Sequence, residues 1–178
     1  RVIVGTITRG GQKPALAFVP YGLPDINAGE DFRSKGGDCI QDNDVDAAQK
    51  LLAEAGYPQG AGLPPITLLY NTSDNHKMIA EAVQEMWKKN LGVSVQLSNQ
   101  EWKVFLDNLD KKNFQIARDN WVGDYNDAMT FIDLFESANG NNNPGYKNPL
   151  YDALVRRAKA TADQSERIKA MHEAERIL

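Results

Sequence analysis

Two aspartates three residues apart are the residues of this sequence best suited to chemistry. Asp124 and Asp127 lie in the stretch WVGDYNDA, residues 121–128, directly after a segment in which apolar and polar residues alternate. Two carboxylates can share the roles of general acid and general base when their environments separate their pKa values. At the start of a helix such a pair more often consists of a cap and a first-turn charge. We therefore interpret Asp127 as a helix cap.

The neighbours of Asp124 favour a cation as its partner. Gly123 lets another backbone approach closely, and the indole of Trp121 offers a flat apolar wall. A carboxylate beside an aromatic ring suits a primary ammonium, through an ion pair with some cation–π attraction. From the residues alone two interpretations of Asp124 stay open, an ammonium-binding group and a residue of a structural loop.

Other chemistry finds little support. No Ser-His-Asp order is present, and His76 and His172 lack the HExxH spacing, so we predict no catalytic residue. The run DNDVD at 42–46 resembles the opening of a calcium loop, but Ala47 and Ala53 stand where that loop needs Gly and Glu. We interpret the run as a solvated helix start and predict neither a metal nor a cofactor.

Composition narrows the class of protein. The chain has 178 residues, of which 42% are hydrophobic and 25% charged, with a net charge of −4. This is typical of a globular domain and argues against nucleic acid as a partner. No apolar run approaches the roughly 18 residues of a membrane span.

The single cysteine, Cys39, is interpreted as a non-catalytic thiol. Because the chain starts at Arg1 and stops within a helical run, we expect it to be part of a longer polypeptide.

Strands and helices alternate along most of the chain. The Gly- and Pro-rich residues 1–42 predict an irregular segment, and residues 43–178 an α/β core with terminal helices. In the helix at 101–112 we expect Trp102, Phe105, Leu106 and Leu109 to be buried. Strands are predicted at 66–70, 93–99 and 114–121, and helices at 45–55, 74–90, 101–112, 127–137, 148–162 and 164–178.

This alternation implies βαβ crossovers and a sheet that is at least partly parallel. Ligands of such sheets tend to bind beyond the carboxyl ends of the strands. The stretch WVGDYNDA follows the third predicted strand, where a site is expected.

Residues 70–135 closely resemble the periplasmic oligopeptide-binding proteins, the extracytoplasmic receptors of ABC peptide importers. The motifs NQEWKVFLD and WVGDYND are the specific ones, and the likeness extends more loosely over nearly the whole chain. The resemblance implies an α/β fold with a mixed sheet flanked by helices, which forms one lobe of a two-lobed periplasmic-binding-protein-like fold. Residues 1–178 would be part of the carboxyl-terminal lobe.

The resemblance also assigns roles to residues. Asp124 would take the α-ammonium of a peptide, and Trp121 would wall a side-chain pocket. Arg118 and His76 would meet the carboxylate of the peptide at different peptide lengths. The ligand-binding residues implied in this way are Asp124, Trp121, Arg118, His76, Val122, Asn120 and Lys13.

The resemblance also implies roles for Asn120 and Lys13 and marks a departure at Val122. The segment from Arg118 through Asn120 to Trp121 would pair with the peptide main chain as an added strand. Lys13 would meet the carboxylate of shorter peptides. Val122 stands where the best-known members of the family carry a disulfide cysteine, and Cys39 has no obvious equivalent in them.

The function implied is that of a non-catalytic receptor. It would capture short peptides in the periplasm and deliver them to the subunits of an ABC permease, as a monomer that meets the membrane only through the permease. Two alternatives remain. One is a related receptor for nickel, a heme-like compound or a sugar, and the other is a hydrolase whose chemistry lies outside these residues.

Overall fold

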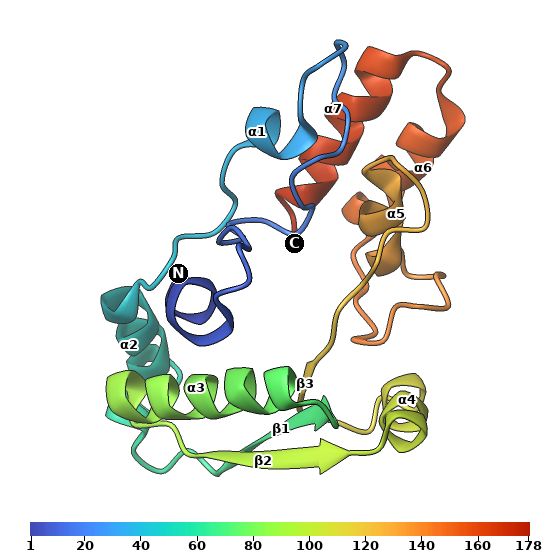
Figure 1. Cartoon of the computed structure of the whole chain (residues 1–178). Coiled ribbons are helices and arrows are strands. Elements are labelled where there is room, and N and C mark those ends of the chain that lie inside the picture. Colours follow the sequence, from blue (N-terminus) through green and yellow to red (C-terminus); the bar gives the residue numbers. More distant parts are fainter. The chain divides into compact units, whose positions relative to one another are not determined.

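The computed structural model describes all 178 residues and divides into two units (Figure 1). Unit 1 comprises Arg1–Pro14 and Asp42–Asn120, and unit 2 comprises Ala15–Gln41 and Trp121–Leu178. None of the helices combines the length and the apolar character needed to cross a membrane.

Unit 1 is built on a parallel sheet of three strands in the order β2-β1-β3. The strands are β1 (Ile66–Asn71), β2 (Val95–Gln100) and β3 (Ile116–Arg118). The helices α3 (Asp74–Leu91) and α4 (Trp102–Asp110) carry the chain back between them, as parallel pairing requires. The predicted α/β class is confirmed. We expected a mixed sheet, but all three strands of this chain run parallel.

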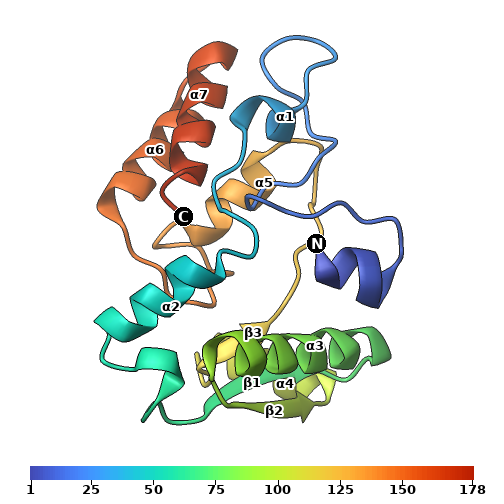
Figure 2. The ribbon, with the colours of Figure 1, turned by 90° about the vertical axis from the view of Figure 1, so that its left-hand side faces the viewer.

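The two faces of β1 explain how the sheet is covered. Side chains alternate along a strand, so Leu68 and Tyr70 pack with Ala80 of α3. Leu69 points to the other face and packs with Phe105 and Leu109 of α4. Both views show α3 running along the sheet (Figures 1 and 2). Each face of the central strand therefore has its own helix.

The remaining helices of unit 1 are short. They are η1, a π-helix (Ile3–Thr8), α2 (Val45–Glu54) and the 3₁₀ turn η2 (Pro58–Gly60). The Asp44 carboxylate accepts a hydrogen bond from the Ala47 N–H at 3.0 Å, which confirms the predicted helix start. The amino-terminal residues, expected to be irregular, form η1 and one short helix, α1 (Phe32–Gly36).

Unit 2 is helical. After α1 come α5 (Met129–Ile132), the 3₁₀ turn η3 (Asp133–Phe135), α6 (Pro149–Ala160) and α7 (Gln164–Glu175). The helices α6 and α7 pack against each other (Figure 1). The helix predicted at 127–137 is thus a short α-helix with one 3₁₀ turn. The largest fully buried side chains of this unit include Phe32, Ile132, Tyr151, Val155, Ile168 and Met171.

A buried ion pair fastens α7 within unit 2. The Arg33 Nη1 atom lies 2.6 Å from Glu175 Oε1, and the two side chains are 3% and 1% exposed. The same carboxylate oxygen accepts the backbone N–H of Val19 at 2.7 Å. Nearby, His172 Nε2 lies 2.8 Å from a carboxylate oxygen of Asp25. These contacts join residues far apart in the sequence.

Two predictions about α4 and β3 were wrong in detail. Trp102 and Leu106 were expected in the core, but they are 50% and 37% exposed in this chain. Phe105 and Leu109 make the buried contact with Leu69, and Trp102 stacks on Phe105 from the outside. The strand predicted at 114–121 is limited to Ile116–Arg118, because only Leu68 to Tyr70 of β1 pair with it.

Candidate functional site

The loop before α5 presents Asp124 to solvent. The backbone N–H of Asp124 donates to Thr130 Oγ1 at 3.0 Å, and Thr130 is only 2% exposed. The carboxylate of Asp124 is exposed and takes part in no hydrogen bond or ion pair. The structure therefore fixes the backbone of this residue and leaves its negative charge without a partner.

The second carboxylate, that of Asp127, differs from the first because it is already paired. Its Oδ1 accepts the N–H of Met129, the first residue of α5, at 2.8 Å, although the N-cap position itself falls on Ala128, one residue later than predicted. Arg167 of α7 donates to both carboxylate oxygens, at 2.7 Å each. Burial raises the pKa of Asp127, but the hydrogen bonds from Arg167 and Met129 outweigh it, so the net pKa lies below its usual value. Asp127 is a structural anion, and Asp124 is the available one.

Trp121, Val122 and Gly123 lead into this loop. Trp121 is half-buried against the core of unit 2, and its Nε1 has no hydrogen-bond partner. Val122 is 77% exposed, and Cys39 is a free, exposed thiol. A Cβ on Gly123 would lie 3.0 Å from Thr130 Cγ2, so the glycine lets the loop lie directly against α5.

A second polar cluster lies in unit 1, at the carboxyl ends of β1 and β3. The register places Tyr70 beside Arg118, so the strands end together. Arg118 Nη1 lies 2.8 Å from His76 Nε2 and 3.1 Å from Asn120 Oδ1. The Nδ1 of His76 lies 2.7 Å from Asn71 Oδ1. The predicted residues Arg118, His76 and Asn120 therefore form one cluster.

The charge of this cluster resides on Arg118. Because the guanidinium can only donate, Nε2 of His76 must accept, and Nδ1 carries the proton toward Asn71. Burial, followed by the charge of Arg118, lowers the pKa of His76. These contacts therefore make His76 a neutral imidazole at pH 7, and Arg118 is the cation of the two residues implied to meet the peptide carboxylate. No carboxylate forms a salt bridge with Arg118. Burial lowers the pKa of Arg118, and the nearby charge of Asp119 partly offsets this, whereas Asp107 pairs with Lys111.

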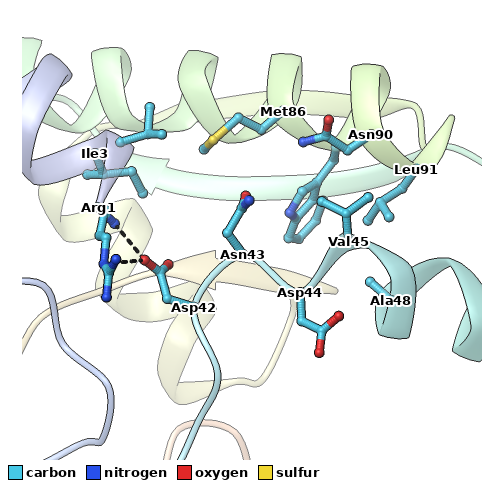
Figure 3. A pocket seen from close by; sticks show the side chains of 12 residues that line it. Arg1, Ile3, Asp42, Asn43, Asp44, Val45, Ala48, Met86, Asn90 and Leu91 are labelled. Carbon is cyan, nitrogen blue, oxygen red and sulfur yellow. Dashed lines mark hydrogen bonds and ion pairs between the residues drawn. The ribbon is translucent and has the colours of Figure 1, made fainter.

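Lys13 is exposed and lies outside any helix or strand. A pocket in unit 1 involves none of the predicted binding residues. It has a volume of about 540 Å³ and lies between η1, α2 and α3 (Figure 3). Arg1 pairs with Asp42 at its edge, at 3.3 Å, and the indole of Trp87 contributes to its lining. No group of three or more His, Cys, Asp or Glu side chains is placed to hold a metal ion.

Sequence reasoning missed three residues of these clusters. Asn71 ends a strand beside a predicted binding residue, a position that could have drawn attention to it. Thr130 is a polar residue within the apolar run MTFI, which is a weak signal. Arg167 lies 40 residues from its partner Asp127, and nothing in its local sequence announces the pairing.

Comparison with protein families matches residues 2–143 to the bacterial extracellular solute-binding proteins, family 5 Middle. The oligopeptide-binding protein OppA of Bacillus subtilis is 44% identical, over 98% of this chain and 32% of that protein. The periplasmic murein peptide-binding protein MppA of Escherichia coli is 40% identical, over 100% of this chain and 32% of that protein. The chain therefore spans about a third of the length of these relatives.

Solved structures agree with the sequence relatives. The crystal structure of Haemophilus influenzae OppA in complex with RPPGFSPFR matches with a TM-score of 0.84 and 36% identity. That match covers 99% of this chain and 34% of the other. Unliganded, open MppA matches with a TM-score of 0.84 and 38% identity, over 100% of this chain and 34% of the other.

Proposed function

The chain belongs to family 5 of the bacterial extracellular solute-binding proteins, and from this membership we propose that it is part of a receptor for short peptides. The complete receptor captures peptides outside the cytoplasm, in the periplasm where the cell has one, and passes them to an ABC permease. It acts by binding and not by catalysis, and these residues are part of its carboxyl-terminal lobe. The names of the relatives, which specify oligopeptides and murein peptides, support this ligand class.

The observation that carries the proposal is the unpaired carboxylate of Asp124. An exposed anion on a fixed backbone, three residues after a half-buried tryptophan, suits the α-ammonium of a peptide. A hydrogen bond to a charged group contributes about 1.5–3 kcal/mol. Micromolar affinity needs about 8 kcal/mol, so other contacts must contribute the larger part. Main-chain pairing with the segment Arg118–Trp121 is one such contact, and it does not depend on the side chains of the peptide.

Arg118 is proposed to meet the carboxylate of the ligand. Arg118 is a half-buried cation without a salt bridge, which favours an anionic partner. His76 and Asn120 hold its guanidinium through hydrogen bonds. Lys13 is proposed to serve shorter peptides, and Trp121 and Val122 to contact peptide side chains. Each of these roles rests on the family resemblance together with the exposure of the residue.

Calorimetry on the complete receptor tests the role of Asp124. A tripeptide with a free amino terminus is compared with its N-acetylated form, for the wild type and for Asp124→Asn. We expect the wild type to favour the free amine by roughly 10- to 100-fold, and the variant to lose this preference. Asp38→Asn is the matched control, because Asp38 is also an exposed aspartate of unit 2. Equal binding of both peptides by the wild type would contradict the proposal.

A further inference from the structure

The loop that carries Asp124 is fastened at both ends, and we call residues 123–127 the acidic loop. At its start, the N–H of Asp124 donates to Thr130 Oγ1 at 3.0 Å. At its end, the carboxylate of Asp127 is held by Arg167 at 2.7 Å and by the N–H of Met129 at 2.8 Å. Between the two ends, the Asp127 N–H donates to the Tyr125 carbonyl at 2.9 Å. The acidic loop is therefore set by side chains outside it.

Thr130 contacts the loop with both branches of its side chain. Its hydroxyl accepts the N–H of Asp124, and its methyl group lies against Gly123, where an added Cβ would come within 3.0 Å. Thr130 is 2% exposed, so water does not compete well for this hydrogen bond. A β-branched side chain has few rotamers, so its hydroxyl has a defined position. This one residue thus fixes the backbone from which the Asp124 carboxylate projects.

Arg167 separates the roles of the two carboxylates. Its two terminal nitrogens each bind one oxygen of Asp127, a bidentate geometry that favours this pair over a looser one. Both side chains are 22% exposed. Because Arg167 pairs with Asp127, the negative charge of Asp127 is compensated and the negative charge of Asp124 is not. Without Arg167, two uncompensated carboxylates would stand three residues apart, and the acidic loop would lose its anchor to α7.

We propose that Thr130 and the Asp127–Arg167 pair are positioning residues for the capture of a ligand ammonium by Asp124. None of them touches the ligand. They act by holding the acidic loop so that one carboxylate, and only one, is available. This inference rests on the proposed function of Asp124 and adds the residues that make its charge usable.

The test uses the complete receptor and the same pair of tripeptides, with and without an N-acetyl group. The quantity measured is the dissociation constant of the N-acetylated peptide divided by that of the free-amine peptide. Thr130→Val keeps the shape of the side chain and removes the hydroxyl, whereas Thr130→Ser keeps the hydroxyl. Val155→Ala is the control for a general loss of stability, because Val155 is fully buried in α6.

We expect Thr130→Val to lower the ratio roughly three- to tenfold, the contribution of one hydrogen bond, by weakening only the free-amine peptide. Thr130→Ser should restore most of the ratio, and Val155→Ala should leave it unchanged. Arg167→Lys keeps the charge but loses the two-point contact, and it should lower the ratio even if Thr130→Val does not fold.

An unchanged ratio in both Thr130→Val and Arg167→Lys would overturn the inference. This holds whether the affinity for both peptides is kept or is lost equally, as a purely structural role would produce. Such a result is distinguishable from failure of the proposed function, which would appear in the wild type as a ratio near one.

Discussion

Replacing Glu175 with glutamine should destabilise α7 far more than the same replacement two residues earlier, at Glu173. Each of these glutamates pairs with an arginine on a neighbouring segment. The pair of Glu175 with Arg33 is 2.6 Å long, with side chains 1% and 3% exposed. The pair of Glu173 with Arg157 is 3.1 Å long, with side chains 49% and 44% exposed. Both are glutamate–arginine ion pairs, but the first pair is buried and its glutamate also accepts the Val19 N–H.

The magnitude follows from what each replacement leaves behind. Glutamine has nearly the same size and helix propensity as glutamate, so neither change creates a cavity or weakens the helix. Removing the charge of Glu175 leaves the buried guanidinium of Arg33 uncompensated, which costs about 3–5 kcal/mol. It also weakens the acceptor for the Val19 N–H. Removing the charge of Glu173 leaves Arg157 in water, and exposed pairs contribute about 1 kcal/mol at most.

Amide hydrogen exchange of α7, measured by mass spectrometry on the complete receptor, gives the free energy of local opening. A loss of 3 kcal/mol corresponds to exchange about a hundredfold faster in Glu175→Gln, against roughly fivefold or less in Glu173→Gln. The double variant Arg33→Met/Glu175→Met should recover much of the loss, because no charge then stays buried alone. Similar exchange rates in the two single variants would refute the reasoning.

Two further predictions concern unit 1. His76 has a pKa below its unfolded value, so its contribution to stability is complete above about pH 6.5 and is lost as the pH falls through the folded pKa. His76→Gln should therefore lose less stability than the wild type in denaturant titrations between pH 7 and pH 5, and an identical loss would count against this. Gly92→Ala should cost about 2–4 kcal/mol, because φ is 68° and the new Cβ would overlap the Gln59 carbonyl. Gly56→Ala, with φ 90° and no atom within 4 Å, should lower the melting temperature clearly less, and equal shifts would contradict the role of the overlap.

The local signals in the sequence were sufficient for most of unit 1. Periodic apolar residues with Asp44 as a cap and Gly92 as a terminator defined α2 and α3, because these signals act within a few residues. The crossover connections then required parallel strands. The exposure of Trp102 was not predictable, since an apolar periodicity shows which residues share a face of a helix and not how much of that face is covered in the fold.

In the candidate site, too, some features follow from the sequence and others only from the tertiary structure. The sequence by itself determined the family and the α/β class, because residue types and spacing are written in the chain, and it proposed the candidate ligand-binding residues. The sequence already favoured Asp127 as a cap and Asp124 as a candidate ammonium-binding group, and only the tertiary structure decided which groups hold each of them. Asp127 is neutralised by an arginine 40 residues away, and Asp124 is fixed by a buried threonine. Only folding brings Arg167 to Asp127, and an ion pair forms by distance in space, not by distance along the chain.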